Sequence, residues 1–345
     1  MSRTRISLVV GAIVSVVVLG GFAARGHAAA RTERPATSKT GAAGLIAFGD
    51  GEAVSVVSAD GSSLAVNVSG NQRAFGPTWA PNGRKLAYSG PHGIWVVNAD
   101  GTGRRRLDRV CLSFGCAQSD GLPVWSPNGR KIAWARGYPG DEGVAVQVVS
   151  ANGSHRRTIA HTCAHRLELE DLPSWSPNGK WLVQAVACPA APPGIRIVRV
   201  SSGRERRIWS GVAYDPVWSP DGKTIAFAAQ SAGTTDLWTM RPNGTDLHQL
   251  SAAGDGVWVL TWSPDSRRIA YWSLQGGVMV VNADNTGAHT VLSTGYGRPA
   301  WSPDSKRLAV IQGQALYTVA LNGQSLHQIA TGNLDSEYSP PVWAP

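Results

Sequence analysis

A tryptophan followed by a short turn sequence recurs along most of this 345-residue chain. The repeated unit reads Trp-Ser/Ala-Pro-Asn/Asp-Gly/Ser, shortened to Trp-Ala-Pro in the copy that ends the chain, and successive copies are about 43 residues apart. The tryptophans of the copies are Trp79, Trp125, Trp175, Trp218, Trp262, Trp301 and Trp343. A period of this length is typical of propeller blades, each made of four antiparallel strands. The repeat therefore predicts an all-β fold in which each copy starts one blade of a β-propeller.

Each repeat also has the internal pattern of four strands. Basic residues and a short apolar segment follow the first turn, as in residues 223–227, and an alternating segment such as 94–98 follows a loop. A second turn, for example 99–101, leads to a final short strand. Asn-Gly and Asp-Gly tolerate the positive φ that tight hairpins need. Two hairpin turns per repeat therefore predict four antiparallel strands per blade.

The two ends of the chain hold complementary fragments of a blade. Residues 45–68 have the pattern of the second, third and fourth strands, whereas residues 342–345 have the pattern of a first strand alone. We predict a seven-bladed β-propeller whose last blade joins the C-terminal strand to three N-terminal strands, because this closure buries open sheet edges. Six blades with unpaired ends is the alternative.

The regularly repeated aromatic, acidic and histidine residues have structural interpretations. A tryptophan at one equivalent position in every blade is predicted to pack between neighbouring blades rather than to stack on carbohydrate. Asp60, Asp100 and Asp284 are interpreted as hairpin residues. The histidines predicted to be solvated on outermost strands are His155, His248, His289 and His327.

The N-terminal segment has the pattern of an export signal. Arg3 and Arg5 precede an apolar run at 6–24 and small residues at 28–30, which predicts a signal peptide over residues 1–30. An uncleaved anchor is the alternative, since a bilayer span needs about 20 apolar residues. Residues 31–44 are expected to form a flexible tether and 45–345 the propeller. The propeller is therefore expected in the periplasm, the cell envelope or the extracellular space.

Cysteine placement in an exported chain favours disulfides. Cys111 and Cys116 are close in sequence, and Cys163 and Cys188 fall in connections expected on one face of the propeller. Other pairings stay open. A zinc site with His161 and His165 near Cys163 is a further alternative, although the paired Cys-x-x-Cys spacing is absent. No cofactor is expected.

One connecting loop stands out as a candidate ligand-binding site. The longest connection collects ionisable residues, and loops on a rigid scaffold often carry function. The candidates are His161, His165, Glu168, Glu170 and Asp171. A solvated acidic loop without a ligand is the alternative.

The charged residues divide between the two ends of the strands. The chain has 32 Lys and Arg residues and 23 Asp and Glu residues. Basic clusters such as 104–106 fall in the hairpin turns, whereas Asp50, Asp215 and Asp255 fall in the opposite loops. We expect an acidic loop face that attracts a cationic ligand or basic partner, and a basic face toward anionic envelope polymers or lipid. The alternative is that Lys and Arg only solvate the hairpins.

The signature Trp-Ser-Pro-Asp/Asn-Gly-Lys/Arg-x-Ile/Leu-Ala resembles the TolB-type, WD-like propeller repeats of exported bacterial proteins. The resemblance covers nearly everything after residue 44. TolB proteins combine a six-bladed propeller with an N-terminal α/β domain and work in the periplasm with lipoprotein partners. This sequence shows seven repeats and no such domain, so the resemblance implies the fold and compartment rather than the Tol–Pal role. Similar propellers precede prolyl-oligopeptidase-like catalytic domains, but the sequence contains no Gly-x-Ser-x-Gly elbow.

Together these features predict an exported, non-catalytic scaffold that binds a protein or another envelope ligand through its loop face. A lyase or lactonase acting on a sugar derivative in the central funnel is the alternative, because fold alone does not choose a function. We expect a monomer that does not bind nucleic acid. Any membrane contact is expected through the N-terminal segment if it is uncleaved.

Overall fold

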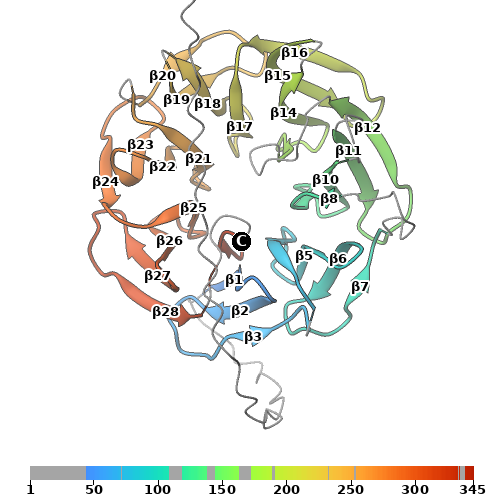
Figure 1. The fold of residues 1–345 in the computed structure, drawn as a ribbon, viewed down its shortest axis with the longest axis vertical. Helices are drawn as coiled ribbons and strands as arrows, with labels where there is room; N and C mark the ends of the chain where they lie inside the picture. Colours follow the sequence, from blue (N-terminus) through green and yellow to red (C-terminus); the bar gives the residue numbers. More distant parts are fainter. Residues whose placement is uncertain are drawn as a thin grey trace, which may run out of the picture. The chain divides into compact units, whose positions relative to one another are not determined.

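Strands from the two ends of the propeller pair to close a ring of seven blades (Figure 1). In this computed structural model, the described residues are 44–345 except 71, 109–118, 138–143, 163–171, 189–190, 232, 252–253, 333 and 335–338. The C-terminal strand pairs antiparallel with the first strand, Trp343 opposite Ile46 and Val342 opposite Ala47. The predicted seven-bladed all-β fold and its mode of closure are confirmed, and the six-bladed alternative is wrong.

Each blade is one antiparallel sheet, and the blades are lettered A to G around the ring. From the innermost strand outward, blade A contains β29 (Val342–Trp343), β1 (Leu45–Gly49), β2 (Val54–Ser58) and β3 (Val66–Asn67). Blade B contains β4 (Phe75–Trp79), β5 (Lys85–Gly90), β6 (Gly93–Asn98) and β7 (Arg105–Arg106). Blade C contains β8 (Ser119–Asp120) and β9 (Val124–Trp125), which both pair with β10 (Lys131–Gly137), then β11 (Val144–Ser150) and β12 (Arg157–Thr162).

The remaining four blades follow in the same order. Blade D contains β13 (Ser174–Trp175), β14 (Trp181–Cys188), β15 (Ala191–Arg199) and β16 (Glu205–Ser210). Blade E contains β17 (Ala213–Trp218), β18 (Ile225–Ser231), β19 (Thr234–Met240) and β20 (His248–Gln249). Blade F contains β21 (Val257–Trp262), β22 (Arg268–Ser273), β23 (Gly277–Asn282) and β24 (His289–Leu292). Blade G contains β25 (Tyr296–Trp301), β26 (Arg307–Gln312), β27 (Ala315–Ala320) and β28 (His327–Thr331).

Apolar side chains of consecutive blades pack against one another and form the core. One cluster joins Ala47 and Val56 of blade A to Trp79, Leu86 and Tyr88 of blade B, and another joins blades E and F. Burial raises the pKa of the Tyr88 hydroxyl to about 12. The hydrophobic effect thus acts between blades as well as within them.

The repeated tryptophans lie at these blade boundaries. Six of them are only 6–8% exposed, the exception being Trp125, which is half-buried. Four donate Nε1–H to a carbonyl of the preceding blade at 3.0–3.2 Å: Trp79 to Val342, Trp175 to Val124, Trp262 to Val217 and Trp301 to Thr261. Each of these four indoles therefore both packs against and hydrogen-bonds to the neighbouring blade.

Glycines in the hairpins between third and fourth strands allow close approach between blades. Gly244 has φ +88°, and a Cβ added there would lie 2.1 Å from the carbonyl oxygen of Ile208 in blade D. At Gly323 the corresponding distance to the Val291 carbonyl is 2.6 Å. Such contacts exclude any larger side chain, so these glycines serve blade packing as well as turn geometry.

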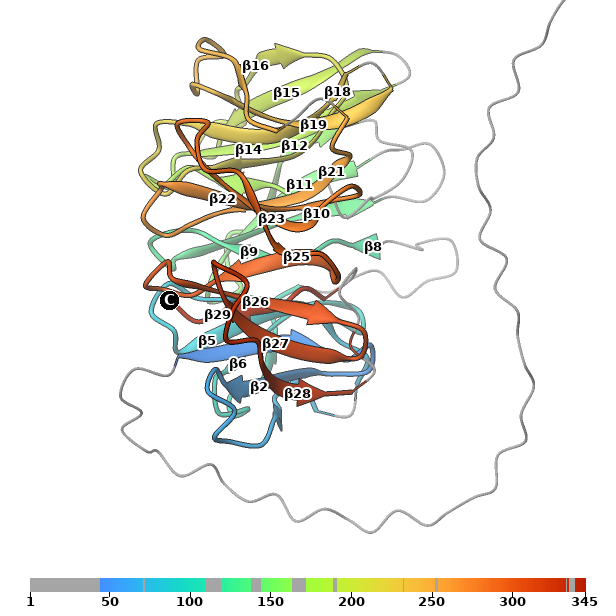
Figure 2. The same cartoon turned by 90° about the vertical axis from the view of Figure 1, so that its left-hand side faces the viewer.

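The two faces of the ring differ in the connections they carry (Figure 2). The motif face carries the turns that follow the repeated tryptophans and the turns between third and fourth strands, together with the C-terminus. The loop face carries the connections between second and third strands and the connections between blades.

Candidate functional site

The candidate ligand-binding loop begins at the end of blade C. His161 is exposed in β12, where it pairs with Ala145 of β11. His165, Glu168, Glu170 and Asp171 lie outside the described residues. The proposed grouping of these five side chains therefore remains a prediction.

The disulfide candidates also fall largely outside the described part of the chain. Cys111, Cys116 and Cys163 lie in undescribed segments, and Cys188 ends β14 without a described side chain. Their pairing stays a prediction. Residues 1–43 lie outside the described residues as well, so the signal peptide and the tether also stay predictions.

Two large apolar side chains are exposed on the loop face of blade F. Trp258 is 47% exposed and Leu274 is 61% exposed. Val257 pairs with Ser273, and the Leu274 amide donates to the Gly256 carbonyl at 3.1 Å, which places both side chains at the same end of β21 and β22. β21 is the innermost strand of its blade (Figure 1). This pair, which we name the loop-face apolar pair, therefore lies beside the centre of the ring.

The strand that carries Trp258, β21, is contacted from the two neighbouring blades by residues that also form an ion pair with each other. Asp215 of blade E is buried and lies 2.7 Å from the Arg298 guanidinium of blade G. Asp215 also accepts the Leu260 amide of blade F at 2.9 Å, and Arg298 donates to the Leu260 carbonyl at 2.8 Å. Both residues thus bind β21 while pairing with each other. The expectation that Asp215 contributes free negative charge to the loop face is wrong, because its carboxylate is buried and neutralised.

A second buried carboxylate joins blades B and C. Asp108 is 4% exposed and forms ion pairs with Arg136 and Arg156. Charges withdrawn from water need such partners. The two ion pairs therefore give Asp108 a structural role rather than a catalytic one.

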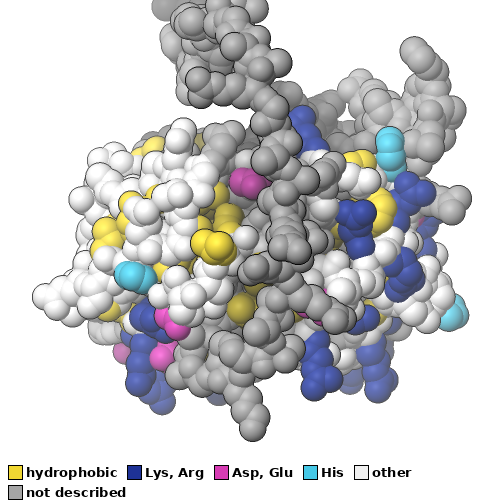
Figure 3. Space-filling model, turned by 90° about the horizontal axis from the view of Figure 1, so that it is seen from below, with side chains coloured by type: hydrophobic (Ala, Val, Ile, Leu, Met, Phe, Trp, Pro, Cys, Tyr) yellow, Lys and Arg dark blue, Asp and Glu magenta, His cyan; other side chains and the backbone are white. Residues whose placement is uncertain are grey.

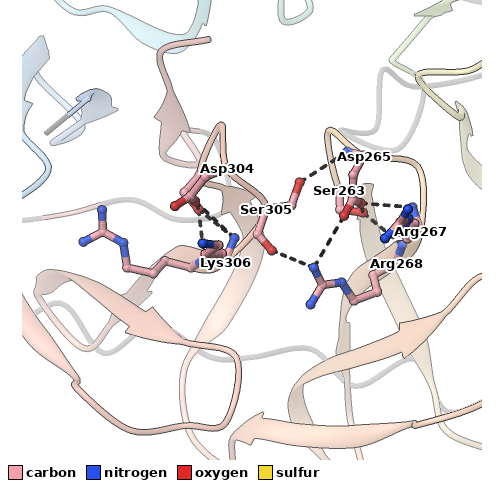
Figure 4. Close-up of polar contacts among 9 residues, drawn as sticks. Ser263, Asp265, Arg267, Arg268, Asp304, Ser305 and Lys306 are labelled. Carbon is pink, nitrogen blue, oxygen red and sulfur yellow. Dashed lines mark hydrogen bonds and ion pairs between the residues drawn. The ribbon is translucent and has the colours of Figure 1, made fainter. Parts of the chain in front are cut away.

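The motif turns use their acidic residues to order backbone. Asp304 accepts a hydrogen bond from the Ser302 hydroxyl at 2.6 Å. It also accepts the Lys306 amide at 3.1 Å (Figure 4). The hydrogen bond from Ser302, opposed in part by burial, lowers the pKa of Asp304. At Asp265 burial raises the pKa, but hydrogen bonds from Ser263 and the Arg267 amide outweigh it, so the pKa of Asp265 is also lowered. These carboxylates are charged structural acceptors.

Serine replaces glycine in the motif turns of blades F and G. Ser266 and Ser305 adopt φ +60° and +58°, a region that favours glycine. Their hydroxyls accept the amides of Asp221 and Asp265 in the preceding blades at 3.0 and 3.2 Å. These contacts give a reason for serine at strained positions, one that a repeat pattern alone does not reveal.

The acidic residues of the third-to-fourth-strand turns behave as predicted. Asp60, Asp100 and Asp284 each accept the backbone amide two residues later, at 2.9–3.1 Å. The prediction that His155, His248, His289 and His327 are exposed is also confirmed. Two of them have a further role, since His289 and His327 hydrogen-bond to carbonyls of the next blade, Leu321 and Asp60.

The motif face is basic in only part of the ring. In Figure 3, Lys and Arg side chains lie along the lower edge of the ring, the side of the motif face, and others lie higher on the right. Exposed carboxylates such as Asp221, Asp265 and Asp304 occupy the same face on blades E to G. The face expected to be basic thus also carries acidic turn formers in blades E to G.

Neither a membrane-spanning helix nor a metal-ligand cluster occurs among the described residues. No helix in this part of the chain has the length and apolar character to cross a membrane. In the same residues, no group of three or more His, Cys, Asp and Glu side chains is placed to hold a metal ion.

The comparisons with known proteins identify the family. The profile of the TolB beta propeller domain matches residues 117–345. The chain belongs to the TolB β-propeller family. The resemblance inferred from its motifs is thus confirmed. This TolB-type propeller is also 30% identical over 175 residues to the Tol-Pal system protein TolB of Anaeromyxobacter dehalogenans strain 2CP-C. That match covers 44% of this chain and 35% of the relative, so the chain spans about a third of the relative's length.

Solved structures share the fold of this TolB-type propeller. TolB from Acinetobacter baumannii superposes with a TM-score of 0.56 at 18% identity, over 88% of this chain and 67% of that protein. An oligogalacturonate lyase from Vibrio parahaemolyticus gives a TM-score of 0.58 at 12% identity, over 84% of this chain and 86% of that protein. At these identities the likeness concerns the fold alone.

Proposed function

We propose that this chain is an exported, non-catalytic scaffold that binds a protein partner through the loop face of its propeller. The observation that carries the proposal is the loop-face apolar pair, Trp258 and Leu274. Exposed tryptophan is enriched at the energetic centres of protein interfaces. The Asp215–Arg298 pair holds the strand beneath Trp258, so little ordering of that strand would accompany binding.

Family membership supports a role in the cell envelope. The curated relative is named as a member of the Tol-Pal system. The N-terminal pattern supports export, with a signal peptide over 1–30, a tether over 31–44 and the propeller over 45–345. N-terminal sequencing of the secreted protein tests this, because cleavage after Ala30 leaves Arg31 as the first residue.

An oxidising compartment would also permit disulfides among Cys111, Cys116, Cys163 and Cys188. Mass analysis before and after reduction tests whether they form.

The test of partner binding is co-purification of the full chain from cross-linked envelope extracts. The double change Trp258→Ser/Leu274→Ser should abolish recovery of the partner, since both apolar contacts are removed. Leu326→Ser provides a matched control, because Leu326 is 44% exposed on the motif face. Equal recovery with both variants would overturn the loop-face proposal.

We propose the candidate loop as a second contact for the same partner. If Glu168, Glu170 and Asp171 attract a basic partner surface, reversing their charges should lower the association rate, most strongly at low salt. His161 and His165 adjoin them in sequence. If the association rate does not depend on these charges, the acidic loop is not part of the interface and the apolar pair alone remains as the proposed contact.

A lyase acting in the central funnel is the competing function, suggested by the shared fold with an oligogalacturonate lyase. The purified chain can be assayed on oligogalacturonate by the ultraviolet absorbance of an unsaturated product. We expect no turnover above the uncatalysed rate. Turnover that is lost with substitutions in the funnel would establish the enzyme and contradict the scaffold.

A further inference from the structure

Blades B, C and D carry arginine where other blades carry histidine, leucine or alanine. At the start of the fourth strand, blade B has 104–106, blade C has 156–157 and blade D has 206–207, all arginine. The equivalent segments of blades E, F and G are Leu-His-Gln, Ala-His-Thr and Leu-His-Gln. These seven arginines, two or three in each of three consecutive blades, are called the basic arc.

Neighbouring contacts hold the basic arc in place. Arg105 donates to the carbonyls of Ala151 and Asn152 in blade C, and Arg157 donates to the Val200 and Ser201 carbonyls in blade D. Arg104 and Arg106 lie 5.8 and 5.9 Å from the ring centre of Trp95. Carbonyls and rings orient these four arginines without neutralising their charge. Arg156 differs from them, because it forms an ion pair with the buried Asp108.

The motif turns of blades B, C and D, which carry the basic arc, lack the negative charge found in blades E, F and G. Blades B, C and D use Asn82, Asn128 and Asn178, whereas blades E, F and G use Asp221, Asp265 and Asp304. Asparagine and aspartate accept the same backbone amide two residues later, at 2.9–3.1 Å in all six turns. The turn geometry is therefore retained in blades B, C and D without a carboxylate in the motif turn.

A cleft opens between the motif turns of blades B and C. It has a volume of about 390 Å³ and is lined by Pro81, Asn82, Lys85, Trp125, Pro127 and Asn128, among others. Trp125 is the half-buried member of the repeated tryptophans, and within the described structure its Nε1 has no hydrogen-bond partner. The cleft thus combines an indole, an ammonium group and two carboxamides.

We propose that this cleft binds one sugar unit of an acidic polysaccharide, with the flanking chain held along the basic arc. The indole of Trp125 contacts the apolar face of the sugar ring, and Lys85 pairs with its carboxylate. Asn82 and Asn128 hydrogen-bond to hydroxyls, and arginine side chains bind carboxylates of neighbouring units. The proposal concerns the motif face and does not rest on the loop-face function.

The composition of the cleft favours a polysaccharide over a lipid surface. A membrane would be attracted by the arginines alone and needs no ring-sized cleft or carboxamides. A volume near 390 Å³ falls in the range of small-molecule sites, which suits one sugar ring and its substituents. Of these two ligands, only a chain of acidic sugars would therefore use both the cleft and the positive charge of the basic arc.

Isothermal titration of the full chain with alginate oligosaccharides tests the proposal. The change Asn82→Asp/Asn128→Asp keeps the turn hydrogen bonds, as Asp265 and Asp304 show, and places two negative charges beside the cleft. We expect this variant to bind at least about tenfold more weakly at low salt. The matched control is Asp265→Asn/Asp304→Asn, outside the basic arc, which should change the affinity by less than about twofold.

Further measurements distinguish recognition of the sugar ring from attraction to negative charge alone. Trp125→Leu should lose most of the binding, and Lys85→Gln, an exposed position, tests the cleft even if the tryptophan variant does not fold. Neutral cello-oligosaccharides should not bind. No alginate binding at low salt would overturn the proposal. So would equal binding of inorganic polyphosphate or phosphatidylglycerol vesicles, or affinity unaffected by both Asn82→Asp/Asn128→Asp and Lys85→Gln.

Discussion

Arg298 of blade G donates a hydrogen bond to the buried carboxylate of Asp215 in blade E, 2.7 Å away and across the intervening blade F. Arg298→Met leaves that carboxylate buried without its cation. Breaking a buried pair in this way costs roughly 3 kcal/mol. We therefore expect a lower free energy of unfolding in urea, with the loop-face apolar pair less rigidly held.

The control for this pair is Asp215→Asn/Arg298→Met. The asparagine retains an oxygen for the Leu260 amide but carries no charge, so the double variant should recover part of the lost stability. If Arg298→Met alone unfolds at the wild-type urea concentration, the pair does not brace the three blades.

Removing the C-terminal strand should open the ring. Deletion of residues 339–345 removes the buried Trp343 and the pairing with β1, and it removes the hydroxyl of Ser339 that accepts the Gly76 amide at 3.0 Å. We expect the melting temperature to fall by more than about 10 °C, because a sheet edge and a core cluster become exposed. Deletion of the exposed Pro345 alone should leave it unchanged.

The sequence repeat was sufficient to predict the ring because one local pattern served every blade. Trp343 near the end of the chain had no strands after it, and Ile46 near the start of the propeller had no repeat tryptophan before it. Their pairing followed from counting strands. The turn roles of Asp60 and Asp284 followed from residue chemistry, since a carboxylate two positions before an amide can cap it.

The candidate site was less predictable because it depends on differences among blades. Trp258 lies outside the repeated motif, so no sequence pattern marks it. Its exposure results from its place at the loop-face end of the innermost strand. Asp215 and Arg298 are distant in sequence, so their pairing appeared only with the ring. The change from Asn128 to Asp265 in equivalent turns was visible in the sequence, but its meaning depends on which arginines lie beside each turn.

Acid should destabilise the motif turns of blades E to G. The pKa values of Asp221, Asp265 and Asp304 are lowered in the folded protein from their ordinary value of 3.8. Their contribution is therefore fully present above about pH 5 and is lost as the pH falls below 4 through the folded values. Asp221→Asn/Asp265→Asn/Asp304→Asn should flatten the loss of melting temperature between pH 5 and 3, approximately. An unaltered acid profile would show that these carboxylates add no pH-dependent stability.

The repeated tryptophans should contribute unequally to the free energy of unfolding. Trp175 is 7% exposed and donates to the Val124 carbonyl at 3.1 Å. Trp125 is half-buried, and its Nε1 has no hydrogen-bond partner among the described residues. Trp175→Phe should therefore cost about 1–2 kcal/mol more than Trp125→Phe in urea unfolding. Equal costs would mean that the hydrogen bond between blades contributes nothing measurable.

The most direct test of the scaffold function is site-specific photo-crosslinking in intact cells. A photoreactive phenylalanine derivative is placed at position 258 of the full chain, and at position 306, an exposed lysine of the motif face, as the matched site. We predict one discrete protein adduct from position 258, lost when Leu274→Ser is added, and no such adduct from position 306. A discrete adduct from position 306 with none from position 258 would contradict the loop face as the partner-binding surface.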